Sequence, residues 1–182
     1  LSAVLLAPAS YQMLKPHQRA RIDSLIAQLT GDDRYNRTIG FQADRARTLV
    51  GAGGFFGNGE ENARNLLRFN ALPEEHNDMI FAVVACRWGL VGGLLVIFLE
   101  AAIVFGAMWV GVTARSPFGR LIGTGIGAML GFQAFVNIGM TLGILPITGL
   151  TLPFVSFGGS SIVASWIAMG ILFSVAARDA KA

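Results

Sequence analysis

The chain has 182 residues, of which 53% are hydrophobic and only 14% are charged, whereas about 25% of residues are charged in a typical soluble domain. This composition indicates a membrane protein and argues against a soluble one. The formal net charge is +3, but residues 15–78 hold nine basic and nine acidic residues, so this polar stretch is balanced and gives no indication of nucleic-acid binding.

The N-terminal segment is apolar but short. The chain begins with Leu rather than Met, and its first ten residues, LSAVLLAPAS, are too few to cross a bilayer. We therefore expect residues 1–14 to be the end of a transmembrane helix whose beginning lies outside this sequence. The single cysteine, Cys86, excludes an internal disulfide and a cysteine-rich metal site.

The polar stretch that follows, residues 15–78, is expected to be an extracytoplasmic loop. Its segment PHQRARIDSLIAQL (16–29) has apolar side chains at helical spacing, which predicts an amphipathic helix lying on the membrane surface. A second short helix is expected from about Asp44 to Val50. The glycines of GAGGFFGNG (51–59) then predict a loop.

Three apolar segments after this loop are long enough for membrane spans of about 20 residues. The expected order is a transmembrane helix at 79–113, a second at 118–145, an extracytoplasmic re-entrant turn at 146–157, a third transmembrane helix at 158–177 and a cytoplasmic tail at 178–182. The first helix is longer than a bilayer requires, which favours a tilt or a break near Gly92 and Gly93. The predicted fold class is therefore all-α, a fragment of a polytopic membrane helix bundle with a large extracytoplasmic loop.

Basic residues in short connections predict the orientation, because Lys and Arg there favour the cytoplasm. Arg115 and Arg120 lie between the first two spans, and Arg178 and Lys181 follow the third. Two membrane crossings separate these two basic segments, so both lie on the same side of the membrane. We assign that side as cytoplasmic. The large loop and the re-entrant turn then face outward.

Several long motifs resemble a known family. They are LKPHQRARI (14–22), RARTLVGAGGFFGNG (45–59), LPEEHNDMIFAVVACRWGLVGG (72–93), NIGMTLGILPITGL (137–150) and LPFVSFGGSS (152–161). In this order they resemble the C-terminal half of the SEDS family, whose members are RodA-like, FtsW-like and SpoVE-like membrane proteins.

The resemblance implies a peptidoglycan glycosyltransferase in the bacterial cytoplasmic (inner) membrane. Such an enzyme polymerises glycan strands from the lipid-linked disaccharide lipid II, in cell elongation or division. The implied partners are lipid II, the growing glycan strand, membrane lipid and a class B penicillin-binding protein, with no nucleic acid. Two alternatives stay open: a lipid II flippase or other transporter, and a non-catalytic membrane scaffold for a transpeptidase.

The segment LPEEHNDMIF places Asp78 directly before the apolar run that begins at Met79. The resemblance implies that Asp78 is the catalytic carboxylate. A sugar hydroxyl is a poor nucleophile until its proton is removed, and a carboxylate within hydrogen-bond reach can remove it. The alternative is that Asp78 only caps the helix that starts at Met79, a position where Asp is favoured.

Substrate binding is expected to involve cations, hydroxyls and glycines on the outer side. The candidates are Lys15, Arg19, Arg45, Arg47, Glu74, His76, Ser156, Gly158, Gly159 and Ser160. Cations stabilise the charge that develops on a diphosphate leaving group, although basic residues also serve loop solubility and head-group contact. No metal ligand and no certain cofactor are expected, but a divalent cation held by Asp78 with Glu74 or Glu75 is an open alternative.

Other residues depart from the family pattern or stand alone. Cys86 and Arg87 replace a common Glu-Glu pair. Glu100 lies within a span, where it is a site residue, a neutral acid or a contact to a helix outside this chain. A polar stripe and a neighbouring glycine stripe on the second span favour close helix packing over contact with substrate. The two stripes are Gln133, Asn137 and Thr141, and Gly123, Gly127 and Gly131.

Overall fold

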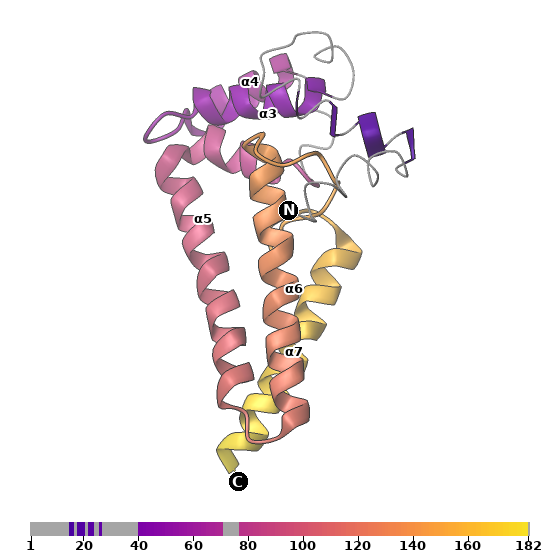
Figure 1. The fold of residues 1–182 in the computed structure, drawn as a ribbon. Coiled ribbons are helices and arrows are strands. Elements are labelled where there is room, and N and C mark those ends of the chain that lie inside the picture. Colours follow the sequence, from indigo (N-terminus) through magenta and orange to yellow (C-terminus); the bar gives the residue numbers. More distant parts are fainter. Residues whose placement is uncertain are drawn as a thin grey trace.

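The computed structural model describes residues 15, 16, 18–20, 22, 23, 26, 40–70 and 77–181. Every regular element among them is a helix, which confirms the all-α class. The helices are α3 (Gly40–Ala52), α4 (Gly59–Asn70), α5 (Ile80–Thr113), α6 (Pro117–Thr141) and α7 (Gly159–Lys181). The last three form an elongated bundle, and α3 and α4 lie across one of its ends (Figure 1).

Two predicted helices of the large loop can be compared with these bounds. The helix expected at about 44–50 lies within α3, which begins four residues earlier and ends two residues later. Of the amphipathic helix expected over 16–29, the described residues at 16, 18–20, 22, 23 and 26 are helical. The rest of that prediction, and the helix end expected at 1–14, lie outside the described residues.

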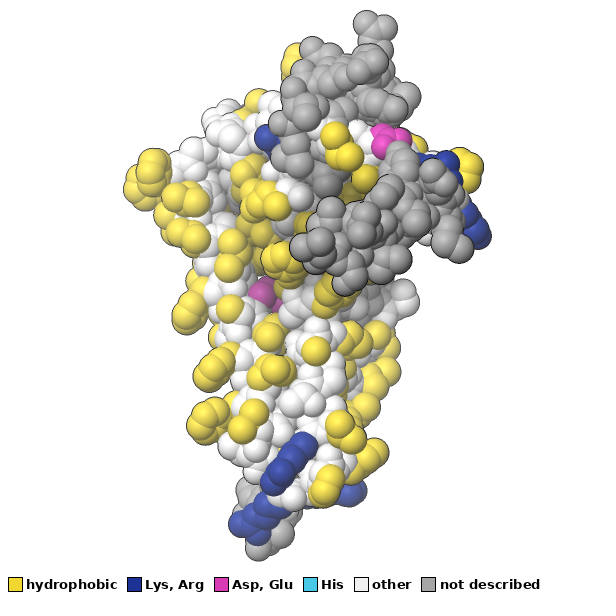
Figure 2. Space-filling model, viewed as in Figure 1, with side chains coloured by type: hydrophobic (Ala, Val, Ile, Leu, Met, Phe, Trp, Pro, Cys, Tyr) yellow, Lys and Arg dark blue, Asp and Glu magenta, His cyan; other side chains and the backbone are white. Residues whose placement is uncertain are grey.

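Within the described ranges, three helices are long and apolar enough to cross a membrane, namely those at Ile80–Thr113, Pro117–Thr141 and Gly159–Arg178. Apolar side chains cover the flanks of these helices, and Lys and Arg side chains lie at both ends of the molecule, including the end opposite α3 and α4 (Figure 2). That end holds the link between α5 and α6 and the end of α7 (Figure 1).

Helix α5 is broken at Gly89, whose φ of 66° and ψ of −159° are not helical. The residues before the break run beneath α3 and α4, and those after it descend through the bundle (Figure 1). The break expected near Gly92 and Gly93 is therefore wrong in position. Those two glycines stay helical and make room for neighbouring side chains, since Gly92 lies against Trp88 and Gly93 against Phe81.

The turn between α3 and α4, residues 53–58, provides partners for the backbone groups that the break exposes. The Leu90 N–H donates to the Gly54 carbonyl at 2.8 Å, and the Cys86 carbonyl accepts from the Asn58 N–H at 3.1 Å. Backbone groups at membrane depth need such partners, because lipid offers none. The turn and the broken helix therefore form one hydrogen-bonded unit.

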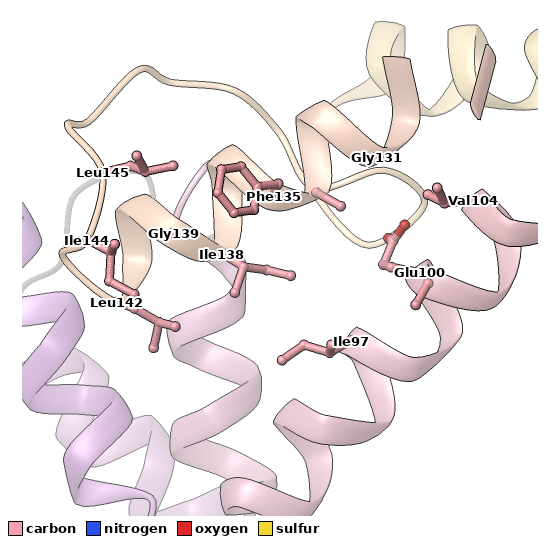
Figure 3. Close-up of a pocket in the computed structure, with 12 residues that line it drawn as sticks. Ile97, Glu100, Val104, Gly131, Phe135, Ile138, Gly139, Leu142, Ile144 and Leu145 are labelled. Carbon is pink, nitrogen blue, oxygen red and sulfur yellow. The ribbon is translucent and has the colours of Figure 1, made fainter. Parts of the chain in front are cut away.

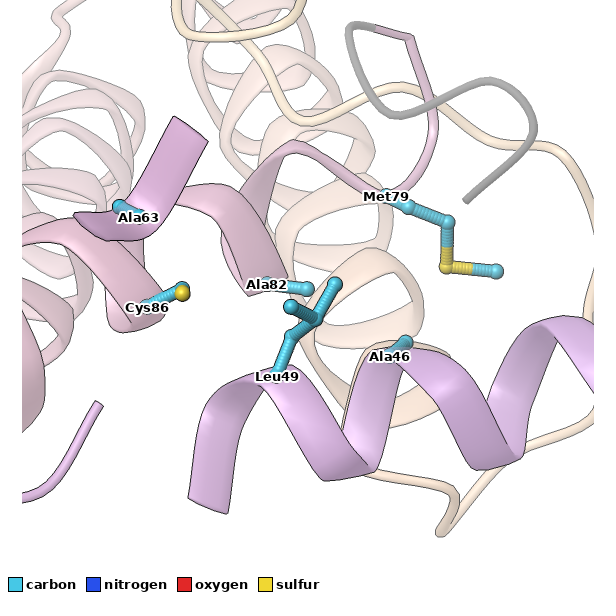
Figure 4. Packing of buried hydrophobic residues seen from close by; sticks show 6 residues of the cluster. All are labelled: Ala46, Leu49, Ala63, Met79, Ala82 and Cys86. Carbon is cyan, nitrogen blue, oxygen red and sulfur yellow. The ribbon is translucent and has the colours of Figure 1, made fainter. Parts of the chain in front are cut away.

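A small apolar core holds α3 and α4 on the first part of α5. It consists of Ala46 and Leu49 from α3, Ala63 from α4, and Met79, Ala82 and Cys86 from the start of α5 (Figure 4). All six are buried, and most are small, which lets the helices approach closely. This core fixes the position at which the first turn of α5 begins.

Helices α5 and α6 pack through glycine. A Cβ atom added at Gly123 would lie 2.5 Å from the backbone nitrogen of Gly111, and one at Gly127 would lie 2.9 Å from Sδ of Met108. Such distances leave no space for a larger residue. The predicted close approach along the glycine stripe is confirmed, and it accounts for the long contact between these two spans.

Helix α6 ends at Thr141, and the chain then runs irregularly to the start of α7. Gly143 has a φ of 71°, and the Ile144 N–H donates to the Gly139 carbonyl at 2.8 Å, which closes the helix end. We call residues 142–158 the α6–α7 connection. It lies at the same end of the bundle as α3 and α4 (Figure 1).

Candidate functional site

Asp78 lies where the start of α5 meets the α6–α7 connection. It is half-buried, and its Oδ2 atom would lie 3.8 Å from a Cβ atom added at Gly149. The helix begins at Ile80 with Met79 as its N-cap residue, so Asp78 precedes the cap position by one residue. Asp78 therefore does not occupy the position that the capping alternative gave it.

Asn137 holds the two backbone segments that frame Asp78. Its side chain is fully buried on α6, and its Nδ2 group donates to the main-chain oxygen of Asp78 at 2.8 Å and to that of Leu150 at 2.7 Å. The sequence indicated only a packing role for this residue. A buried amide near the end of an apolar span, followed by an irregular loop, is the signal that could have predicted such a bridge.

Replacing Asn137 by alanine should destabilise this end of the bundle. Both carbonyls would lose a buried donor, at about 1–3 kcal/mol each. We expect a clear fall in the unfolding temperature of the purified protein, measured by intrinsic fluorescence in detergent. Gln133→Ala is the matched control, since this amide lies one turn earlier and makes no hydrogen bond within the described part of the chain. Equal falls in the two variants would contradict the bridging role.

Two of the predicted cations come from α3. Arg47 is exposed, and its side chain packs over the turn at Gly143, where an added Cβ atom would lie 2.5 Å from Cδ of Arg47. Arg45 is half-buried, with its Nη1 atom inaccessible to solvent. Arg47 and Asp78 thus lie beside the two ends of the same loop, residues 143–149.

The remaining candidates of the N-terminal region are placed less completely. Lys15 is exposed, its backbone N–H donates to Oε1 of Gln18 at 3.0 Å, and Arg19 is half-buried one helical turn later. Glu74 and His76 lie outside the described residues. No group of three metal-binding side chains occurs in the part of the chain that the structure describes, which does not include Glu74 and Glu75.

The candidates near α7 divide into two kinds. Ser156 is buried, and its Oγ atom accepts from the Leu152 N–H at 2.7 Å, so it closes a turn of the connection. The Gly158 carbonyl accepts from the Ile162 N–H at 2.9 Å and so belongs to the start of α7. Gly159 and Ser160 are exposed there. Of the four, only these last two are exposed.

Glu100 belongs to a different place, a pocket of about 390 Å³ between α5 and α6. Apolar residues such as Ile97, Phe135 and Ile138 surround it (Figure 3). The residue is only 4% exposed, and one carboxyl oxygen has no hydrogen-bond partner among the described residues. No residue of this pocket is one of the candidate site residues, so Glu100 is not part of the arrangement around Asp78.

Comparison with known proteins identifies the family. The profile of the FtsW, RodA and SpoVE family, described as a cell cycle protein, matches residues 1–181. The chain belongs to this family. Membership confirms the resemblance seen in the motifs.

Relatives in the FtsW/RodA/SpoVE family carry enzymatic names. The chain is 36% identical to the Bacillus subtilis protein named "Probable peptidoglycan glycosyltransferase FtsW", over 94% of this chain and 42% of the relative. It is 38% identical to the Escherichia coli protein named "Peptidoglycan glycosyltransferase MrdB", over 75% of this chain and 36% of the relative.

A solved structure is also similar. It is described as showing the structural coordination of polymerization and crosslinking by a peptidoglycan synthase complex. It matches with a TM-score of 0.69 at 30% identity, over 93% of this chain and 45% of that chain. The chain thus spans less than half the length of these relatives.

Proposed function

We propose that this chain carries the catalytic carboxylate of a peptidoglycan glycosyltransferase that polymerises lipid II. The observation that carries the proposal is the position of Asp78, half-buried where the start of α5 meets the α6–α7 connection. This position lies at one end of three apolar helices, where the head group of a lipid-linked sugar is presented. The names of the relatives support the same activity.

The chemistry required of Asp78 is that of a general base. A hydroxyl oxygen of the acceptor sugar attacks the anomeric carbon of the donor sugar, and Asp78 takes the hydroxyl proton as the new bond forms. The bond between the anomeric carbon and the diphosphate oxygen breaks, and the lipid diphosphate leaves with the electron pair. Attack opposite the leaving group inverts the anomeric centre, and no general acid is needed because a diphosphate is a stable anion.

The charge on the leaving diphosphate needs a counter-charge. Arg47 is suited to this task because it is exposed and packs on the loop beside which Asp78 also lies. Arg45 adds a second guanidinium group on the same helix, and guanidinium groups bind phosphate oxygens at two points. A divalent cation held by Asp78 with Glu74 or Glu75 would supply the same stabilisation, and chelation of the purified enzyme tests that version.

The proposed setting is the outer face of the bacterial inner membrane. The three membrane-compatible helices and the basic residues at the end away from Asp78 support this orientation. The similarity to a chain from a peptidoglycan synthase complex supports a class B penicillin-binding protein as partner. The proposed activity serves cell elongation or cell division.

The direct test is glycan-strand formation by the purified full-length protein together with its transpeptidase partner. Incubation with lipid II should give a ladder of glycan strands on a gel. A transporter would move lipid II between leaflets of a vesicle without making a ladder. A scaffold would do neither. Either of these two results would overturn the proposed function.

A further inference from the structure

A second polar site lies on the outer side, between α4 and the first part of α5. Three arginines, Arg64, Arg68 and Arg87, line a pocket of about 320 Å³ together with Glu60 and the apolar stems around Val83. None of these residues is a candidate for the Asp78 site. The pocket therefore calls for an explanation of its own.

The charges in this pocket do not balance. Glu60 bridges two of the arginines, with Oε2 at 2.6 Å from Nη2 of Arg87 and Oε1 at 3.1 Å from Nη2 of Arg64. Arg68 has no ion pair within the described ranges of the chain. Among the described residues that line the pocket, three guanidinium groups face a single carboxylate, which leaves a positive site suited to an anion. The bridge also holds the Arg87 side chain, 34% exposed, in a fixed place.

An apolar groove begins directly beside this pocket. The guanidinium carbon of Arg87 lies 5.1 Å from the centroid of the Trp88 ring, a cation–π contact. Trp88, with Phe56, Val91 and Leu95, lines a groove of about 440 Å³ along the outer part of α5. Trp88 is 53% exposed and lies next to the break at which α5 turns into the bundle. Tryptophan favours this level of a membrane, between head groups and acyl chains.

We propose that the pocket and the groove together bind an anionic phospholipid of the outer leaflet. Its phosphate would lie among Arg64, Arg68 and Arg87, and one acyl chain would lie along Trp88 and Leu95. The order of the site, cationic and then aromatic and then aliphatic, matches the order of groups in such a lipid. The proposal does not depend on the glycosyltransferase activity, because the two sites share no residue.

The test uses the fluorescence of Trp88. Trp109→Phe and Trp166→Phe leave Trp88 as the sole tryptophan of these 182 residues. Any further tryptophan of the full-length protein is also replaced by phenylalanine. This protein is reconstituted in phosphatidylcholine bilayers that contain either brominated phosphatidylglycerol or brominated phosphatidylcholine, whose bromine atoms quench a neighbouring tryptophan. Brominated phosphatidylglycerol should quench Trp88 at a clearly lower mole fraction than brominated phosphatidylcholine does.

Variants at Arg68 separate binding from folding, because this side chain has no ion pair to lose among the described residues. Arg68→Gln should reduce the preference for phosphatidylglycerol about fivefold. This factor corresponds to the attraction of about 1 kcal/mol that one basic residue contributes near an anionic surface. Arg68→Lys should keep most of it. Arg115→Gln, which removes the same charge at the other end of the bundle, should leave the preference unchanged.

Several results would overturn the proposal. One is equal quenching by the two brominated lipids. Another is a preference that survives both Arg68→Gln and Arg87→Gln. Relief of quenching by inorganic phosphate alone would show a phosphate site without a lipid. Relief by undecaprenyl diphosphate, at a far lower mole fraction than unlabelled phosphatidylglycerol, would assign the site to diphosphate lipids instead.

Discussion

Asp78→Asn should reduce glycan-strand polymerisation by about 10²- to 10⁴-fold, the usual contribution of a general base. An amide has the same shape as a carboxylate but does not accept the proton of the attacking hydroxyl. The hydrogen bond from Asn137 should survive, because it goes to the main-chain oxygen of residue 78 and not to its side chain. The measurement is the rate of ladder formation from lipid II, beside the unfolding temperature of the same preparation.

The matched control for this variant is Asp44→Asn, which makes the same chemical change at an exposed position of α3. It should leave the rate within about twofold of the parent. Asp78→Glu keeps the carboxylate but moves it by one methylene, so it should regain part of the lost rate. Near-normal polymerisation by Asp78→Asn would remove the catalytic assignment, whatever its effect on stability.

Much of the fold could be predicted because membrane helices follow from composition. Each of the three spans is a continuous apolar segment of about 20 residues or more, the length at which a helix crosses a bilayer. The all-α class therefore follows from hydropathy alone. The break in α5 was predicted for the right reason, excess length, but at the wrong glycines. Its position depends on the α3–α4 turn, whose backbone groups pair with those of α5 across 28 to 36 residues of sequence.

The candidate site was predicted only in part. Asp78 was found through the motif that contains it, and Arg47 through its charge. The bridging role of Asn137 was not predicted, because its partners are two backbone carbonyls in other segments, and the polar stripe that contains it was interpreted as packing alone. Phe154 has a φ of 60°, which a bulky residue rarely adopts. The Phe154 ring makes an edge-to-face contact with the Trp166 ring, and the sequence does not predict this contact.

Gly89→Ala should unfold or misassemble the outer end of the protein. The backbone there has a φ of 66° and a ψ of −159°, a region open almost only to glycine, at a strain of about 1–3 kcal/mol for other residues. An added Cβ atom would also lie 2.6 Å from the carbonyl of Phe55, and this clash adds about 1–3 kcal/mol. We expect a large fall in unfolding temperature and in folded yield, measured by fluorescence-detected size-exclusion chromatography.

Gly106→Ala is the control on the same helix, since an added Cβ atom there meets no neighbour within 4 Å. It should be neutral or stabilising, because alanine is favoured over glycine inside a helix by about 1 kcal/mol. Equal stability of the two variants would mean that α5 can run unbroken. An unbroken helix of 34 residues would be about 51 Å long, far beyond a hydrocarbon core of about 30 Å. Arg87 and Trp88 would then leave the membrane surface, so the same result would also remove the geometric basis of the proposed lipid site.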